Sequence, residues 1–132
     1  MSEENVEVVR RIYEHLNRGD VEGVAQLCDD DFLMDMSERV FNPDTYQGHA
    51  GIRRFYEGVR EVWESYLWNI EETRVTGDSV VALLHCQGHS RKGGPGVDWR
   101  VAWLWKLQRG RAVSVRFYRE RGKALEAAGL RA

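Results

Sequence analysis

The residue with the clearest capacity for chemistry is Asp35, an acid within the short apolar segment 32–36. We interpret this segment as a strand in which Asp35 faces the interior of the protein. Loss of water disfavours a charged carboxylate, so burial would raise the pKa of Asp35 toward the range of a general base. Asp35 is therefore the predicted acid/base residue. The alternative is a carboxylate at the strand end that is exposed or is paired with an arginine in a structural ion pair.

Aromatic side chains are the second group with functional potential, because the chain has five Trp and five Tyr among 132 residues. Such rings bury large areas and can stack on a flat ligand, although more often they only fill a core. The predicted walls of a ligand pocket are Trp63, Trp99, Trp103 and Phe117.

A base alone would lack a group that stabilises an oxyanion, which is often the largest contribution to catalysis. The candidates for that role are Tyr13, Tyr56 and Arg119. Core packing is the alternative for the two tyrosines, and a surface position is the alternative for Arg119.

Metal and phosphate chemistry are disfavoured by spacing. On a strand that rises about 3.3 Å per residue, His85 and His89 lie roughly 13 Å apart and Cys86 faces the other side, so they cannot share an ion. The glycine-rich segment 92–96 joins two strands and opens no helix, so it cannot cradle phosphate as a P-loop does. We expect no metal and no cofactor.

Helices are predicted for the first half of the chain and strands for the second. Apolar residues recur at three- and four-residue steps over 5–16, 21–28 and 52–66, and the last of these helices is the longest. Turn signals at 76–79, 92–96 and 108–111 then divide the remainder into four antiparallel strands, at 68–75, 80–90, 97–107 and 112–120. A short helix over 123–128 closes the chain. This order predicts an α+β fold in which the helices cover one face of a curved antiparallel sheet.

Strand alternation predicts which side chains meet the helices. Trp99 and Trp103 share the helix-facing side with small residues of the preceding strand, Ala82, Cys86 and Gly88. Small side chains opposite large rings leave room for a cavity that holds a small apolar ligand. The outer face is predicted to carry His85, Gln87, Arg116 and Tyr118.

Five local patterns carry a resemblance to a known family. They are Tyr13-(x)5-Gly19-Asp20, Asp29-Asp30-Asp31-Phe32, Tyr46-Gln47-Gly48-(x)3-Ile52, the run 101–107 before Arg109-Gly110-Arg111, and the final run 124–130. With this order of elements the chain resembles the nuclear-transport-factor-two-like superfamily, and particularly its SnoaL-like polyketide-cyclase branch, over almost its full length. Each pattern is a structural cue and none is a catalytic signature.

The resemblance implies a cone-shaped barrel, in which a curved antiparallel sheet wraps around the long helix and the N-terminal helices. It also implies a pocket between sheet and helices and a homodimer through the outer sheet face. Asp35 matches the proton-shuttling aspartate of the ketosteroid isomerases, but Trp103 stands where those enzymes have an oxyanion-holding acid. The position at which those enzymes have a tyrosine on the first helix is occupied here by Ile12. Tyr13 is the next residue, and one residue turns a helix by about 100°, so its side chain points in another direction. The superfamily includes enzymes and non-catalytic binding modules, so fold does not settle function.

Bulk properties limit the partners and the location. We expect one domain over residues 1–132, and the formal charge of -2 gives no field that would steer the chain to nucleic acid or anionic lipid. No apolar run is long enough to span a membrane, and the first residues are polar and acidic rather than those of a signal peptide. We therefore expect a cytoplasmic protein without a membrane or nucleic-acid partner.

Together these features predict a cofactor-independent isomerase, cyclase, dehydratase or hydratase that acts on a small, largely apolar molecule with Asp35 as general acid/base. The alternative is a non-catalytic homodimer that binds a hydrophobic ligand or partner in the same cavity. A third possibility is a structural interaction domain whose own aromatic side chains fill the cavity.

Overall fold

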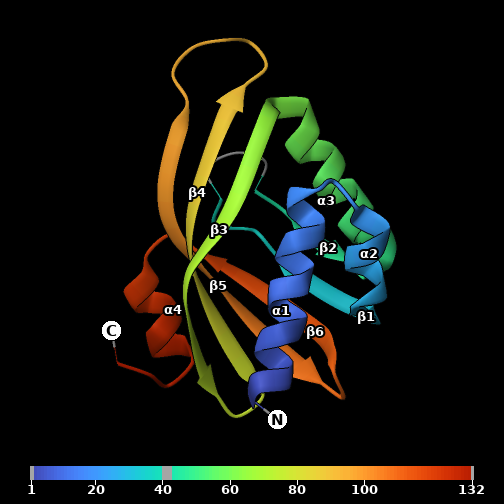
Figure 1. Ribbon diagram of the computed structural model, residues 1–132, viewed down its shortest axis with the longest axis vertical. Coiled ribbons are helices and arrows are strands. Elements are labelled where there is room, and N and C mark those ends of the chain that lie inside the picture. The colour runs from blue at the N-terminus through green and yellow to red at the C-terminus, as the bar shows by residue number, and fades with distance from the viewer. Residues whose placement is uncertain (1, 40–42, 132) are drawn as a thin grey trace.

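The computed structural model describes residues 2–39 and 43–131. The helices and strands of these residues follow one another as α1 (Ser2–Asn17), α2 (Val21–Gln26), β1 (Cys28–Asp35), β2 (Thr45–Gln47), α3 (Gly48–Val62), β3 (Trp63–Thr76), β4 (Ser79–Ser90), β5 (Val97–Gln108), β6 (Arg111–Tyr118) and α4 (Arg121–Ala127). The predicted α+β order, with most helices before the long strands, is confirmed (Figure 1).

The helices form where the apolar spacing predicts them. Val9, Ile12 and Leu16 recur on one face of α1 and are at most 2% exposed. Gly19 adopts a left-handed φ of 73° between α1 and α2, and Asp20 then caps α2 by accepting a hydrogen bond from the Gly23 N–H at 2.9 Å. The apolar face of α1 and the buried residues of α2 belong to the same core.

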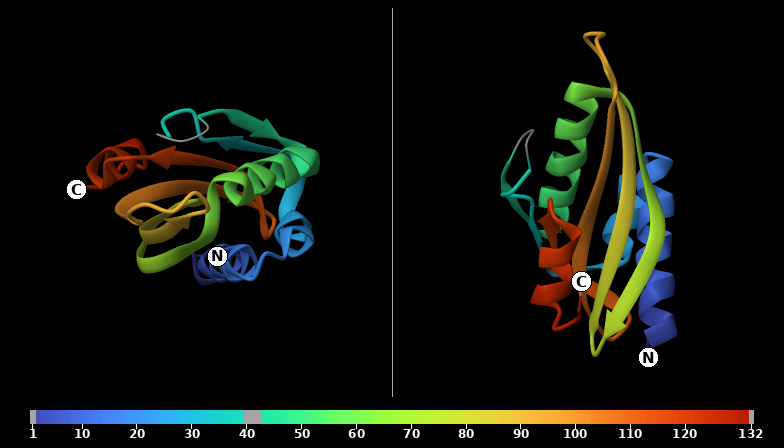
Figure 2. Two further views of the ribbon diagram at one scale, coloured as in Figure 1. Left: turned by 90° about the horizontal axis from the view of Figure 1, so that it is seen from above. Right: turned by 90° about the vertical axis from the view of Figure 1, so that its left-hand side faces the viewer.

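The strands form one sheet in the order β2-β1-β6-β5-β4-β3. All neighbours are antiparallel except β1 and β6, which run parallel. The sheet has β2 and β3 as its edges and does not close, and it curls so that α1 and α3 lie across its concave side (Figure 2).

Several boundaries differ from the sequence prediction, and the one that matters for the site lies between α3 and β3. The helix predicted over 52–66 ends at Val62, and β3 begins at Trp63 rather than at residue 68. The apolar pattern misled the prediction because Trp63 and Tyr66 contribute to the core from a strand as well as they would from a helix.

Two groups of buried side chains lie on opposite faces of the sheet. The larger one joins α1, α2 and α3 to the concave face and contains the predicted inward residues Trp103 and Trp105. The smaller one lies under α4, where Leu125 packs with Leu83 and Tyr118. Tyr118 is thus on the outer face as predicted, but α4 covers it.

No helix in the described ranges is long and apolar enough to cross a membrane.

Candidate functional site

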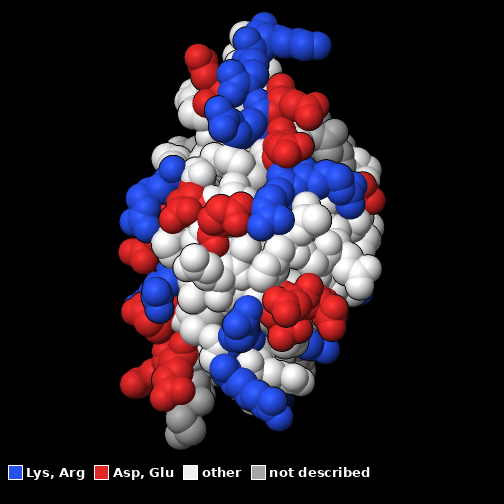
Figure 3. Space-filling view, turned by 90° about the vertical axis from the view of Figure 1, so that its right-hand side faces the viewer, with Lys and Arg blue, Asp and Glu red and all other residues white. Residues whose placement is uncertain are grey.

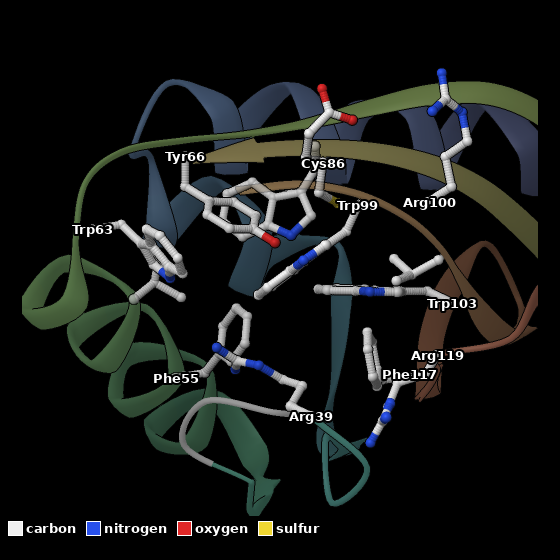
Figure 4. A pocket seen from close by; sticks show the side chains of 14 residues that line it. Arg39, Phe55, Trp63, Tyr66, Cys86, Trp99, Arg100, Trp103, Phe117 and Arg119 are labelled. Carbon is white, nitrogen blue, oxygen red and sulfur yellow. The ribbon is translucent and has the colours of Figure 1, made fainter. Parts of the chain in front are cut away.

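A cavity of about 330 Å³ lies between α3, the concave face of β3 to β6 and the turn after β1 (Figure 4). Its size falls within the range of about 300–1,000 Å³ that is usual for small-molecule sites. Half of the residues that line it are aromatic: Phe55, Trp63, Tyr66, Trp68, Trp99, Trp103 and Phe117.

The aromatic wall follows from strand register and from contacts between rings. Trp99 pairs with Cys86 and Trp103 with Ala82 across β5 and β4, so the indoles extend from the same face as their small partners. Trp63 meets Trp99 edge to face at a centroid distance of 6.1 Å, and Phe55 meets Trp103 in the same way at 6.1 Å. These contacts hold the rings in place, so the wall is formed before any ligand arrives.

Gly88 sets the position of the wall at the end of β4. A Cβ at Gly88 would lie 2.7 Å from Tyr66 Cδ2 and 3.1 Å from Trp63 Cε3. The missing side chain therefore leaves room for these two rings, and not directly for a ligand as the sequence suggested.

Arg39 is the most buried cation of the cavity, and sequence reasoning missed it. It follows β1 in a turn in which its backbone N–H donates to the Met36 carbonyl at 3.1 Å. The side chain runs to the Phe55 ring, and the guanidinium carbon lies 5.1 Å from the centroid of that ring (Figure 4). Burial lowers the pKa of the Arg39 guanidinium, because the charged form is deprived of water.

The proton-bearing groups inside the cavity stay neutral at neutral pH. Burial raises the pKa of the Cys86 thiol to about 12, and burial also raises the pKa of the Tyr66 phenol above its ordinary value. Asp98 lines the rim, where a hydrogen bond with His85 lowers the pKa of its carboxyl; the Nε2 to Oδ1 distance is 2.5 Å. Neither Cys86 nor Tyr66 can therefore act as a base near pH 7.

The structure brings five of the predicted site residues together. Trp63, Trp99, Trp103, Phe117 and Arg119 all line the cavity. Arg119 lies at its edge, with the guanidinium directed away from the rings (Figure 4).

The two predicted tyrosines lie elsewhere. Tyr13 is 2% exposed and accepts a hydrogen bond from Trp105 Nε1 at 2.9 Å, and burial raises the pKa of its phenol well above the ordinary value. Tyr56 lines a separate hollow beside the end of α1, where its hydroxyl lies 2.9 Å from the place of a Cβ on Gly19. Core packing therefore describes Tyr13, and neither ring lines the cavity.

The prediction that Asp35 faces the interior is wrong. Met34 and Met36 are at most 1% exposed, so alternation turns Asp35 to the other face together with Leu33, which is 43% exposed. Asp35 Oδ1 accepts hydrogen bonds from the Ser37 hydroxyl at 2.6 Å and the Ser37 N–H at 3.0 Å, and Arg116 Nε lies 3.8 Å from Oδ2.

The electrostatics of Asp35 are also the reverse of the prediction. The Ser37 hydrogen bonds and the nearby Arg116 lower the pKa of its carboxyl, with the Ser37 hydroxyl the largest cause. Asp35 is half-buried at the strand end and is paired with an arginine, as in the second form of the alternative, and its geometry gives no support to a role as general base.

Two comparisons with known proteins agree with this fold, and a third found nothing. Residues 9–115 match the sequence profile described as the SnoaL-like domain. No curated protein matches the chain. An NTF2-like protein of unknown function from Burkholderia pseudomallei is 22% identical with a TM-score of 0.78, over 97% of this chain and 98% of that one.

Two further similar structures hold small molecules. TerC co-crystallised with polyporic acid is 21% identical with a TM-score of 0.78, over 95% of this chain and 97% of that one. The Mycobacterium tuberculosis protein RV0760c in complex with estradiol-17beta-hemisuccinate is 18% identical with a TM-score of 0.74, over 89% of this chain and 94% of that one. Likeness at this level of identity shows a shared fold.

Proposed function

The chain belongs to the family of SnoaL-like domains, and on that premise we propose that it binds a small organic molecule with a flat, apolar body in the cavity between α3 and the sheet. The observation that carries this proposal is the cavity of about 330 Å³, whose aromatic rings contact one another edge to face. Flat ligands gain buried area and ring contacts in such a wall.

The structures of similar fold support small-molecule binding as the general class. TerC was crystallised with polyporic acid, and RV0760c with estradiol-17beta-hemisuccinate. Identities of 21% and 18% show a shared fold alone, so the ligands of those proteins are not carried over to this chain. The flat, apolar shape that we propose for the ligand is inferred from the cavity of this chain.

Binding has more support than the acid/base reaction predicted around Asp35. Asp35 lies outside the cavity lining, and the high pKa values of Cys86 and Tyr66 leave both groups protonated near neutral pH. We therefore do not assign a proton-transfer step to this cavity.

We further propose that the domain spans residues 1–132, resides in the cytoplasm and forms a homodimer through the outer face of the sheet. The part of that face not covered by α4 carries His85 and Gln87, which suits a polar interface. A mass of one chain by light scattering would contradict the dimer and leave the cavity proposal intact.

The cavity proposal is tested by filling the cavity. Val101 lines it and is 6% exposed, so Val101→Phe places a ring in the space, whereas Leu33→Phe adds the same ring at a position that is 43% exposed on the other face. The probe is 2-naphthol, a flat neutral molecule, titrated by calorimetry.

We expect Val101→Phe to weaken 2-naphthol binding at least about tenfold, which corresponds to roughly 1.4 kcal/mol, and Leu33→Phe to leave it within about twofold. Unfolding curves of both variants check that the fold is retained. Absence of saturable binding to the wild type, or equal binding by Val101→Phe, would refute the proposal.

A further inference from the structure

Arg39 carries a positive charge that no carboxylate of the described residues neutralises. No carboxylate in residues 2–39 and 43–131 forms an ion pair with it. Several other arginines do form such pairs, for example Arg53 with Glu22 at 2.7 Å. The guanidinium stays charged in proteins. Its cation–π contact with Phe55 offsets part of the lost hydration, but a ring supplies neither hydrogen-bond acceptors nor a net negative charge.

The other charged groups that line the cavity do not provide the missing counter-charge. Asp98 is the one acid in the described lining, and its carboxylate is hydrogen-bonded to His85 of the neighbouring strand β4. Arg100 and Arg119 add positive charge to the rim, where Arg100 Nε lies 3.6 Å from Oε1 of Glu71, a residue outside the lining. The described lining thus holds three cations against one acid, and the acid already has a partner.

The position of Arg39 fits an acidic group on a flat molecule. A guanidinium is a planar fork of donors that matches the two oxygens of a carboxylate, and such pairs strengthen when water is excluded. A flat body stacked among Trp99, Trp103 and Phe117 would bring a substituent at its edge toward Arg39, which lies across the cavity from these rings (Figure 4).

We infer that the ligand of this cavity is an aromatic acid, with its ring system held by the aromatic wall and its carboxylate bound by Arg39. This inference rests on the proposed function and narrows it from apolar molecules in general to flat anions. It also makes Arg39 the residue that determines specificity.

The test compares two probes that differ only in charge, 2-naphthoate and 2-naphthamide, by calorimetric titration of the whole chain. We expect the wild type to bind 2-naphthoate at least about tenfold more tightly than 2-naphthamide, because only the former gains a charge-assisted pair. Arg39→Gln should abolish this preference by weakening 2-naphthoate at least about tenfold while changing 2-naphthamide by less than about threefold.

Two further variants separate charge from shape. Arg39→Lys keeps the charge without the fork and should retain part of the preference. Arg11→Gln removes an exposed arginine from α1, outside the cavity lining, and should leave both affinities unchanged. Melting curves show whether each variant is folded.

The outcomes distinguish this inference from the proposal beneath it. Suppose that the wild type binds 2-naphthamide as tightly as 2-naphthoate and that Val101→Phe weakens the binding of 2-naphthamide. The inference then fails and the cavity proposal stands. If Arg39→Gln weakens both probes equally, Arg39 is only part of the wall and the inference also fails. If neither probe binds the wild type, the cavity proposal itself is refuted.

Discussion

The hydroxyl of Tyr13 is a polar atom within an apolar core. The side chain is 2% exposed, its ring contacts both Trp103 and Trp105, and its oxygen accepts the Trp105 indole hydrogen bond at 2.9 Å. A buried donor that loses its only acceptor costs the full desolvation of that donor. The role of Tyr13 is therefore to satisfy Trp105, behind the cavity wall rather than within it.

Tyr13→Phe is accordingly expected to lower the free energy of unfolding by about 1–3 kcal/mol, because the Trp105 N–H is left buried without an acceptor. Tyr56→Phe is the matched control, since Tyr56 is only partly buried, and should change that free energy by less than about 0.5 kcal/mol. Urea unfolding measures both. If Tyr13→Phe leaves stability unchanged and weakens 2-naphthol binding, Tyr13 belongs to the site after all.

Asp35 and Arg39 show which side-chain directions cannot be predicted from the sequence. The face of Asp35 was misjudged because Phe32, Leu33 and Met34 are all apolar, so the strand shows no alternation from which to read direction. Arg39 lies in a turn without periodicity, and its direction is set by the Phe55 ring, a long-range contact. The inward direction of Trp99 and Trp103 is predictable because the charged residues Asp98 and Arg100 of the same long strand have the opposite parity.

Among the elements, the hairpins were predictable and the pairing of distant strands was not. Gly77 and Gly110 occupy tight turns with φ of 55° and 75°, as the turn signals predict, and they join β3 to β4 and β5 to β6. The parallel pairing of β1 with β6 joins segments far apart in the chain, and no local pattern encodes it. The outer position of α4 also depends on tertiary contacts.

The helix α4 is anchored by one arginine and one small apolar cluster. Arg121 donates to the Leu84 carbonyl at 2.8 Å and to the Val101 carbonyl at 3.3 Å. Leu125 is 5% exposed and packs with Leu83 and the other buried residues of the outer face. These contacts tie α4 to β4 and β5, two of the strands that line the cavity.

Leu125→Ala is therefore expected to lower the free energy of unfolding by about 2–3 kcal/mol, since it removes buried methyl groups and leaves a void beneath α4. Leu67→Ala makes the same change in a side chain that is 46% exposed, and should cost less than about 1 kcal/mol. Thermal or urea unfolding gives both values. Equal costs for the two variants would mean that α4 contributes little to stability.

At the scale of the whole molecule, charge is distributed rather than concentrated. On the face that Figure 3 shows, basic and acidic side chains are interspersed, in keeping with a formal charge of -2. Many carboxylates have a basic partner or a backbone donor, and these contacts lower the pKa values of Asp20, Glu22, Asp44, Glu71 and Asp98. Each surface pair is weak alone, and high salt screens it further.

The lowered carboxyl pKa values and the raised pKa values of the buried thiols together predict how the free energy of unfolding depends on pH, with a plateau near neutral pH. A carboxyl whose pKa is lowered in the folded state stabilises the protein above its unfolded pKa, near 4, and that contribution is lost as pH falls through the folded value. Burial raises the pKa of Cys28 and of Cys86 to about 12, which has the opposite consequence. Their contribution is complete below the unfolded thiol pKa, about 8.5, and declines as pH rises toward 12.

We therefore expect the free energy of unfolding to be nearly constant between about pH 5 and pH 8 and to fall on both sides. Urea unfolding at a series of pH values measures the profile. Added salt should reduce the acid slope, because exposed pairs cause it. Cys28→Ala and Cys86→Ala should each reduce the alkaline slope, since the buried thiol that must ionise is gone. An alkaline slope that neither variant changes would assign alkaline unfolding to the buried phenols of Tyr13 and Tyr66 instead, whose pKa values burial also raises.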